Sequence, residues 1–274
     1  MSASAGRMVA MLDTVWLARA LSNEGLGRPL HVYESLESTN ATALELARAG
    51  APHGSLVVAD EQTAGRGRSG RRWLTPPGAA LAFSLVLRPQ SVSPQALGGL
   101  NVLGALAVVE AAARREIAAQ IKWPNDVLVG GRKVAGILVE ATWRGEALEY
   151  VVLGIGVNVL SASVPPDEQV DYPATSLESA ARRPILREPL LVDIVGAVGR
   201  WYPAVGTEAL REMWQRHLAF LGEWVSLTGG SVEMRGRERG VEPDGRLLLE
   251  DEAGRTFFAP PEGAHLRPVD RSAR

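Results

Sequence analysis

The chain of 274 residues contains no cysteine. This absence excludes disulfide bonds, thiolate zinc sites, iron–sulfur clusters and a thiol nucleophile. Histidine is scarce as well, and the four histidines lie far apart along the chain, at positions 31, 53, 217 and 265. None of them has a partner at the spacing of metal ligands, so we do not expect a histidine-based metal centre.

An excess of charge of one sign is also missing. The chain has 29 Lys and Arg against 31 Asp and Glu, which gives a net charge of −2. This balance does not favour binding of nucleic acid or of an anionic membrane through overall charge. We therefore expect neither nucleic acid nor membrane as a partner.

Long apolar runs are lacking. The apolar stretch at residues 8–12 is shorter than the core of a signal peptide. The compact apolar part of the longest uncharged span covers residues 96–109, which is too short for a bilayer that needs about 20 residues. These features predict a buried helix at 95–115 and a cytoplasmic protein.

The chain has the pattern of an α/β protein with a small β domain at its C-terminal end. Apolar spacing and capping residues predict helices over 13–25, 38–50, 95–115, 187–202 and 206–220. Strands are expected at 31–33, 55–59, 82–87, 127–129, 133–140 and 150–159, and long loops at 61–80 and 161–184. After residue 222, short strands are expected at 224–228, 231–234, 246–250 and 256–259, separated by glycine turns, as in a small β-barrel. We expect two domains, 1–222 and 223–274.

The strongest local signal is the segment GRGRSGRRW at residues 65–73, with three glycines and four arginines. Glycines let the backbone approach a ligand, and arginine side chains present fixed pairs of donors to phosphate or carboxylate oxygens. The segment predicts an anion-binding loop, the alternative being a solvated basic loop. Its Gly-x-Gly-x-x-Gly spacing does not indicate a dinucleotide fold, because Pro76 and Pro77 block the helix and Gln90 stands where an acidic residue belongs.

Three further segments carry candidate chemistry. In KWPND, residues 122–126, a braced turn presents Asn125 and Asp126, which suit a hydrated magnesium ion or a ribose. The alternative is an Asx-turn that enters a hairpin. In GIGVN, residues 154–158, two glycines on a strand let a flat ligand lie against the backbone.

Lys133 is the third candidate. Its alternate neighbours Ala135, Ile137 and Val139 are apolar, so we expect the lysine to point toward a covered face. A buried lysine needs an anionic partner, because an unpaired buried charge is costly. The alternative is a lysine at the mouth of a hairpin that faces water.

These segments and STN at residues 38–40 occur in one order within residues 34–160, and together they resemble the biotin protein ligases. The resemblance implies an α/β catalytic domain with a mixed sheet, like that of class II aminoacyl-tRNA synthetases, followed by an SH3-like β-barrel. It implies ATP-dependent ligation of biotin, through biotinyl-5′-AMP, to a lysine of a biotin carboxyl carrier protein or domain of acetyl-CoA carboxylase or a related enzyme. Mg²⁺ would accompany ATP. Such a reaction needs positioned charges and no enzyme nucleophile.

The resemblance also assigns roles to individual residues. Biotin contacts would come from Ser38, Thr39, Asn40, Gln62, Arg66, Gly67, Arg68, Lys133, Gly136, Gly154 and Gly156. ATP contacts would come from Arg68, Arg71, Trp73, Lys122, Asn125, Asn158 and Arg267, and Asp126 would serve the metal. Lys133, Arg66 and Arg68 are the expected catalytic residues. We expect the loop at 63–74 to be disordered without ligand and to fold over the adenylate.

Two other functions are considered. One is a ligase for lipoate or octanoate. The other is a repressor that responds to biotinyl-adenylate, which is disfavoured because the 37 residues before Ser38 contain only three arginines, Arg7, Arg19 and Arg28, and no lysine. We therefore expect the form of the family without an N-terminal DNA-binding domain. A non-catalytic biotin-binding protein is disfavoured because the loop arginines and Lys133 are all present.

Overall fold

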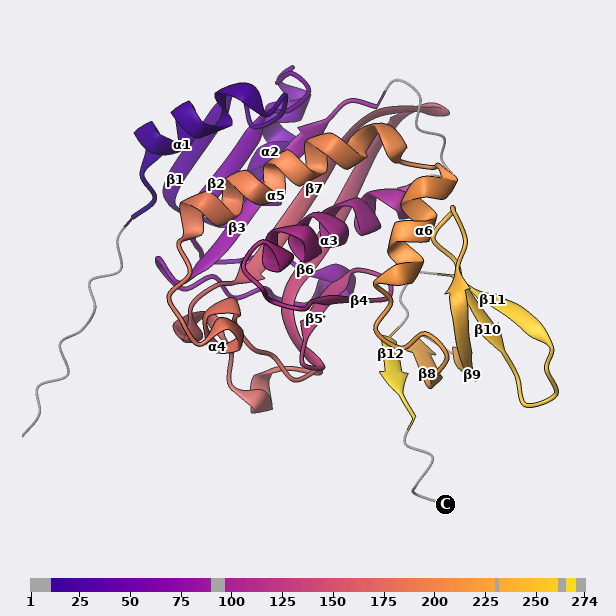
Figure 1. Cartoon of the computed structure of the whole chain (residues 1–274). Helices are drawn as coiled ribbons and strands as arrows, with labels where there is room; N and C mark the ends of the chain where they lie inside the picture. Colours follow the sequence, from indigo (N-terminus) through magenta and orange to yellow (C-terminus); the bar gives the residue numbers. More distant parts are fainter. Residues whose placement is uncertain (1–10, 90–96, 230–231, 261–264, 270–274) are drawn as a thin grey trace, which may run out of the picture.

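The computed structural model of the chain describes residues 11–89, 97–229, 232–260 and 265–269. Its larger sheet has seven strands in the order β1-β2-β3-β7-β6-β5-β4 (Figure 1). These strands are β1 Leu30–Leu36, β2 Leu56–Gln62, β3 Ala80–Leu87, β4 Gln120–Lys122, β5 Asp126–Val129, β6 Arg132–Arg144 and β7 Ala147–Asn158. The pair β1–β2 is parallel and the other neighbours are antiparallel, so the sheet is mixed, as expected.

Helices lie on both faces of this sheet (Figure 1). The α-helices are α1 Thr14–Ala20, α2 Thr39–Arg48, α3 Leu97–Ala113, α4 Leu177–Ala181, α5 Arg187–Trp201 and α6 Glu208–Arg216. Helix α3 lies so close to the sheet that a Cβ atom on Gly104 would be 2.9 Å from Cγ1 of Ile137 in β6. Helix α5 covers α3, which explains why α3 is apolar on nearly all sides rather than amphipathic.

Helix α2 packs on the opposite face of the sheet. Its Ala43 and Ala47 form a small apolar cluster with Val57, Val86 and Val152 of the strands beneath. Beyond the N-terminus of α2 the strands carry small residues on this face, where bulky side chains would otherwise fill the space. That change from valine to glycine and alanine leaves room for a ligand beside the start of the helix.

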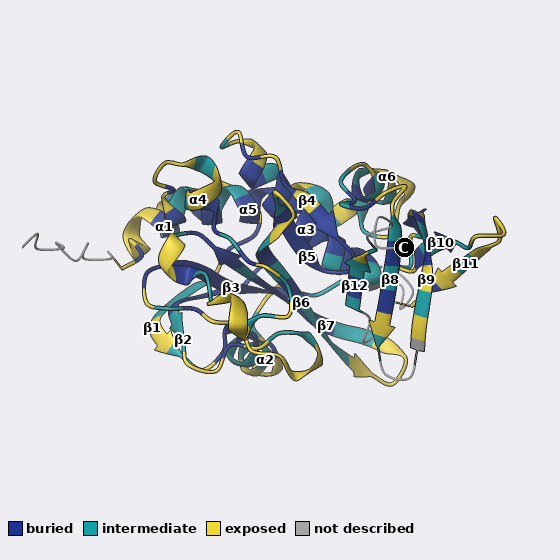
Figure 2. Ribbon diagram, turned by 90° about the horizontal axis from the view of Figure 1, so that it is seen from below, coloured by how far each residue is buried: buried dark blue, intermediate teal, exposed yellow. Residues whose placement is uncertain are grey.

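The C-terminal sheet is antiparallel with the order β11-β10-β9-β8-β12. Its strands are β8 Trp224–Gly229, β9 Val232–Val241, β10 Leu247–Glu250, β11 Thr256–Ala259 and β12 His265–Pro268. Nε1 of Trp123, in the β4–β5 turn, donates to the carbonyl of Gly245 at 2.9 Å, and thereby joins the two sheets. This second sheet is consistent with the expected SH3-like domain, while the boundary at residue 222 stays a prediction. Figure 2 shows its outer strand, β11, as largely exposed.

Several elements differ from those expected. The stretch 161–184, expected as a loop, contains α4, which begins where the Ser176 hydroxyl accepts the backbone N–H of Ser179. The short strands β4 and β12 were not predicted, since three or four residues give little periodic signal. The helix at 13–25 divides into α1 and a 3₁₀ turn, and the helix at 206–220 shortens to α6. Residues 95, 96 and 231 of the expected elements lie outside the described residues.

The described helices were also compared with the length and hydropathy that a membrane span requires. None of those in residues 11–89, 97–229, 232–260 and 265–269 meets both conditions.

Candidate active site

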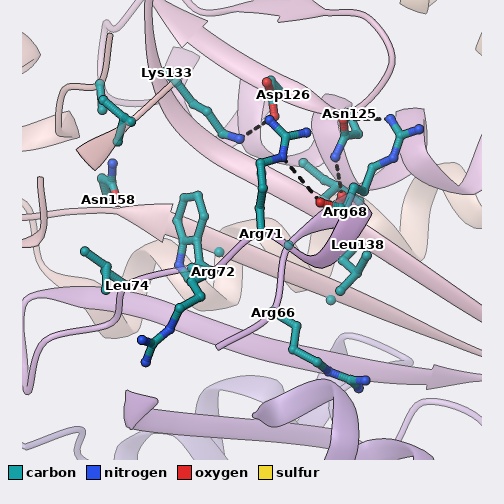
Figure 3. A pocket seen from close by; sticks show the side chains of 18 of the residues that line it. Arg66, Arg68, Arg71, Arg72, Leu74, Asn125, Asp126, Lys133, Leu138 and Asn158 are labelled. Carbon is teal, nitrogen blue, oxygen red and sulfur yellow. Dashed lines mark hydrogen bonds and ion pairs between the residues drawn. The ribbon is translucent and has the colours of Figure 1, made fainter. Parts of the chain in front are cut away.

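A cavity of about 470 Å³ opens on the α2 side of the large sheet. Its wall includes every site residue expected from the sequence (Figure 3). These residues come from the start of α2, from five strands of the large sheet, from β12 and from residues 63–74, which we call the glycine–arginine loop. These residues are Ser38, Thr39, Asn40, Gln62, Arg66, Gly67, Arg68, Arg71, Trp73, Lys122, Asn125, Asp126, Lys133, Gly136, Gly154, Gly156, Asn158 and Arg267. The structure thus brings all of them together, and their individual ligand contacts stay predictions.

Glycines form the floor of the cavity. A Cβ atom on Gly154 would lie 2.0 Å from Oδ1 of Asn40, and one on Gly156 would lie 2.4 Å from Cε2 of Trp73. Both distances are far below van der Waals contact, so a side chain at either position would displace a residue of the wall. The indole of Trp73 lies directly on the glycine strand, and its buried Nε1 has no hydrogen-bond partner among the described residues.

One end of the cavity is neutral and rich in hydrogen-bonding groups. Oε1 of Gln62 accepts the backbone N–H and the hydroxyl of Thr39 at 2.8 and 3.1 Å. The Ser84 hydroxyl donates to Oδ1 of Asn40 at 2.6 Å. Nδ2 of Asn40 in turn donates to Oε2 of Glu140 at 2.7 Å. This network fixes the side chains at the N-terminus of α2 and suits a polar, uncharged group of a ligand.

The other end is cationic. Asp126 binds Nζ of Lys133 through Oδ1 at 2.5 Å and Nζ of Lys122 through Oδ2 at 3.0 Å. Burial alone would raise the pKa of Asp126, but the charges and hydrogen bonds of Lys133 and Lys122 outweigh it and hold that pKa well below its usual range. Burial lowers the pKa of Lys122, and Asp126 opposes the change. The cluster is therefore a charged group with net charge +1 beside the cavity.

Lys133 has the expected anionic partner and lines the cavity, but strict alternation along β6 does not account for its orientation. The β5–β6 pairing shifts between Val127 and Leu128, so that Val127 pairs with Ala135 and Leu128 pairs with Lys133. This bulge inserts one residue and places Lys133 on the same face as Gly136, whose Cβ position lies 3.2 Å from Nζ of the lysine. Ile137 faces α3 instead. The alternation of side chains therefore breaks at the bulge, and Lys133 points toward the cavity.

The glycine–arginine loop, residues 63–74, is folded over the cavity. The N–H of Gly67 donates to the carbonyl of Arg71 at 2.7 Å, and that of Trp73 donates to Gly65 at 2.8 Å. Nη1 of Arg68 donates to Oδ1 of Asn125 at 3.1 Å, which aims this arginine at the cationic end. The expected ordering of the loop by ligand stays a prediction.

Two arginines of the loop, Arg71 and Arg66, contact different acidic side chains. Arg71 lies 3.7 Å from a carboxylate oxygen of Asp171, and Arg66 pairs with Glu140 at 3.1 Å. Figure 3 shows that Arg66 points away from Lys133. The expected contact of Arg66 with biotin therefore requires that the arginine side chain leave Glu140.

A wall of the cavity formed by the segment before α4 was not predicted. The lining residues missed by the sequence interpretation are Arg72, Leu74, Ala82, Ile137, Leu138, Ile155, Pro165, Gln169, Val170, Asp171, Tyr172 and Ala174. Half of them lie in the stretch 161–184, which has no motif and was expected to be a loop. Only its aromatic residue, Tyr172, offered a signal, because an isolated ring in a polar loop needs a packing partner.

The residues present do not favour a metal ion bound directly by Asp126. Both of its carboxylate oxygens are engaged by ammonium groups, which would repel a divalent cation. No group of three or more His, Asp or Glu side chains in the described part of the chain is arranged to hold a metal. Asp126 fits better as the counter-ion that orients Lys122 and Lys133.

The chain is similar to known proteins over most of its length. The model of the biotin/lipoate A/B protein ligase family matches residues 32–158. A biotin–[acetyl-CoA-carboxylase] ligase from Mycobacterium tuberculosis is 36% identical over 274 residues, covering 95% of this chain and 98% of the relative. The chain belongs to the biotin/lipoate A/B protein ligase family. A bifunctional ligase/repressor BirA from Bacillus spizizenii is 37% identical over 239 residues, which cover 85% of this chain and 73% of that relative.

Structural similarity extends beyond the segment matched by the family model. The biotin protein ligase from Aquifex aeolicus in complex with biotin and ATP superposes with a TM-score of 0.74 and 27% identity, covering 88% of this chain and 100% of that chain. A match of this length must extend beyond residue 158. The expected fold class, an α/β protein with a mixed sheet and a further β sheet at the C-terminal end, is confirmed.

Proposed function

We propose that this member of the family is a ligase that joins biotin to a lysine of a biotin carboxyl carrier domain, using ATP and forming biotinyl-5′-AMP. The observation that carries the proposal is one cavity with a neutral hydrogen-bonding end, a glycine floor and a cationic end. The named activity of the Mycobacterium tuberculosis relative and the biotin and ATP bound by the Aquifex aeolicus structure support it.

The geometry fits the adenylation step. The neutral end, with Thr39, Asn40 and Gln62, would bind the ureido head of biotin, so that the carboxylate reaches the cationic end. There the carboxylate oxygen attacks the α-phosphorus of ATP and pyrophosphate leaves. Lys133 and Arg68 would stabilise the negative charge that gathers on the phosphoryl oxygens in the transition state.

The transfer step needs little more from the protein. The neutral amine of the acceptor lysine attacks the acyl carbon of biotinyl-5′-AMP and an amide bond forms. AMP leaves with the bonding electrons of the acyl–oxygen bond, and the attacking nitrogen releases one proton to the solvent. The same cations stabilise the departing phosphate. Folding of loop 63–74 over the intermediate would exclude the water that would otherwise hydrolyse the anhydride.

Mg²⁺ would enter with ATP, bound to its phosphates, and would neutralise charge on the leaving pyrophosphate. Because Asp126 is already paired with two lysines, the phosphates would supply most of the metal's ligands. We further propose that the acceptor is the carrier domain of acetyl-CoA carboxylase or of a related carboxylase, and that the protein works in the cytoplasm, where such carboxylases would supply the acceptor.

The decisive test is mass spectrometry of a carrier domain incubated with the purified protein, biotin and Mg-ATP. We expect a gain of one biotinyl group on one lysine, and none when ATP is omitted or when that lysine is replaced by arginine. Pyrophosphate exchange with biotin, lipoate and octanoate in turn tests the acid. Exchange with lipoate or octanoate but not with biotin would overturn the proposal.

A further inference from the structure

The strap, residues 171–175, contacts cationic residues that belong to different parts of the structure. Its Pro173 carbonyl accepts the backbone N–H of Lys133 at 2.8 Å, and the N–H of Thr175 donates to the Lys133 carbonyl at 2.9 Å. Nδ2 of Asn158 donates to the carbonyl of Thr175 at 3.2 Å. These bonds fix the strap against the edge of the β5–β6 hairpin, beside the cationic end of the cavity.

Within the strap, the side chain of Tyr172 contacts two cationic side chains, Lys122 and Arg267. Nζ of Lys122 lies 4.8 Å from the centre of its ring, and Cζ of Arg267 lies 5.0 Å from the same centre. Both distances are within the range of cation–π attraction, about 6 Å. Tyr172 thus holds a lysine of the large sheet and an arginine of the C-terminal sheet beside one ring.

Arg267 depends on the strap for its position. Its Nη2 donates to the carbonyl of Asp171 at 2.7 Å, and its own strand, β12, belongs to the second sheet. The carboxylate of Asp171 lies 3.7 Å from Arg71 of the glycine–arginine loop. The strap therefore contacts the cation from β12, the cation from β4 and one cation of the loop, all of which line the cavity.

We infer that Tyr172 is a positioning residue for the nucleotide: its ring holds Lys122 and Arg267 at the cavity wall, where both cations serve the phosphates of ATP. This inference rests on the proposed function and adds a residue to it. Like charges repel and would separate when no anion is bound, and the π face offers each of them a negative partner. The phosphate-binding cations are then already gathered when ATP arrives.

The test compares Tyr172→Leu, which removes the ring, with Tyr172→Phe, which keeps it. Steady-state pyrophosphate exchange gives the KM for ATP and for biotin separately, and titration calorimetry with a non-hydrolysable ATP analogue gives the affinity without turnover. For Tyr172→Leu we expect a KM for ATP and a Kd for the analogue raised roughly tenfold, with the KM for biotin changed less than about twofold. Tyr172→Phe should retain wild-type values.

A matched control exists in the C-terminal sheet. Cζ of Arg246 lies 4.5 Å from the centre of the Phe258 ring, but this cation–π pair is not part of the cavity wall. Phe258→Leu therefore removes a comparable contact and should leave both KM values unchanged. Thermal unfolding of each variant identifies a general loss of structure.

A double variant identifies the route of the effect. If the ring acts through Arg267, Tyr172→Leu combined with Arg267→Ala weakens ATP binding by less than the product of the two single effects.

The inference is overturned if Tyr172→Leu leaves analogue affinity within twofold of wild type, if Tyr172→Phe fails as badly as the leucine variant, or if the two single effects multiply. Absence of biotin-dependent exchange by the wild-type protein would count against the proposed function instead, and the analogue titration would still decide the role of Tyr172.

Discussion

Two buried carboxyl groups, one in each sheet, have opposite surroundings. Asp126 of the large sheet is held between Lys122 and Lys133, and these charges keep its pKa well below the usual range although burial acts to raise it. Glu238 of the C-terminal sheet is only 1% exposed, and neither of its carboxyl oxygens has a hydrogen-bond partner among the described residues. Burial, with a smaller contribution from Glu223, raises the pKa of Glu238 to about 8.

The contrast shows that burial alone does not determine the charge of a side chain in this protein. The cavity retains an ionised group because two ammonium groups offset its desolvation, and the result is a set of fixed charges ready for a substrate. Among the described residues of the C-terminal sheet, none binds the carboxyl oxygens of Glu238, and with its raised pKa this group holds its proton at neutral pH. At Asp126 this buried charge lies beside the place where phosphates are expected to bind.

Lys133→Gln tests the cationic end most severely. The substitution removes a cation that faces the cavity and leaves Asp126 with only one ammonium partner. Loss of such a transition-state contact lowers the rate by about 10²–10³-fold, and we expect that loss in kcat for pyrophosphate exchange.

The matched control for this variant is Arg144→Gln. Arg144 lies on the same strand, β6, is 80% exposed and pairs with Glu149 outside the cavity wall. It should retain nearly full activity. A loss at Lys133 no greater than at Arg144 would contradict a role of Lys133 in the reaction.

Asp126→Asn tests the buried pairing. Removing the charge leaves Lys122 buried beside Lys133 without a counter-ion, which costs about 3 kcal/mol of unfolding free energy near pH 7. The folded pKa of Asp126 lies below its unfolded value of about 3.9, so its contribution is fully present above that pH and is lost as the pH falls below it. Denaturant unfolding should therefore show a difference between variant and wild type that is constant from pH 5 to 7 and shrinks toward pH 3. Asp167→Asn, at an exposed pair, is the control and should show little difference at any pH.

Glu238→Gln should have the opposite sign. The folded pKa of about 8 exceeds the unfolded value of about 4.3, so folding retains a proton and wild-type stability falls as the pH rises between these values. The variant is neutral at every pH and lacks this fall. We expect it to be about as stable as wild type at pH 4 and more stable at pH 9, by up to about 5 kcal/mol if the whole pKa shift is realised. The measurement is the difference in unfolding free energy between variant and wild type. If this difference is no larger at pH 9 than at pH 5, Glu238 has a partner in solution.

The sequence was sufficient where the chemistry is local. Gly154 and Gly156 predict a surface against which a ligand can lie, and the arginines of residues 65–73 predict an anion-binding loop. Each prediction depends only on the residue type at its own position. The structure places all of these residues on one cavity. The apolar pattern located most strands of the large sheet to within a few residues, and the family resemblance implied that the sheet is mixed.

Features that depend on long-range contacts were missed. The orientation of Lys133 depends on a bulge between β5 and β6, which a strict alternation of side chains does not predict. Tyr172 meets Lys122, 50 positions earlier, and Arg267, 95 positions later, across segments that share no motif. Glu140 is an ordinary strand residue in the sequence, yet it binds both Asn40 and Arg66.

Glu140→Gln provides the smallest expected effect and completes the contrast between buried and exposed charge. The Arg66–Glu140 pair has side chains that are 43% and 28% exposed, so water and salt screen it, and such pairs contribute about 0.5 kcal/mol or less. Glutamine keeps an oxygen that accepts Nδ2 of Asn40, so the neutral end of the cavity stays ordered. Unfolding free energies should differ from wild type by no more than this amount at low salt and by less at 0.5 M salt, since screening lengths shorten as ionic strength rises. A cost near that of Asp126→Asn would mean that the pair holds the glycine–arginine loop as firmly as the buried lysines hold Asp126.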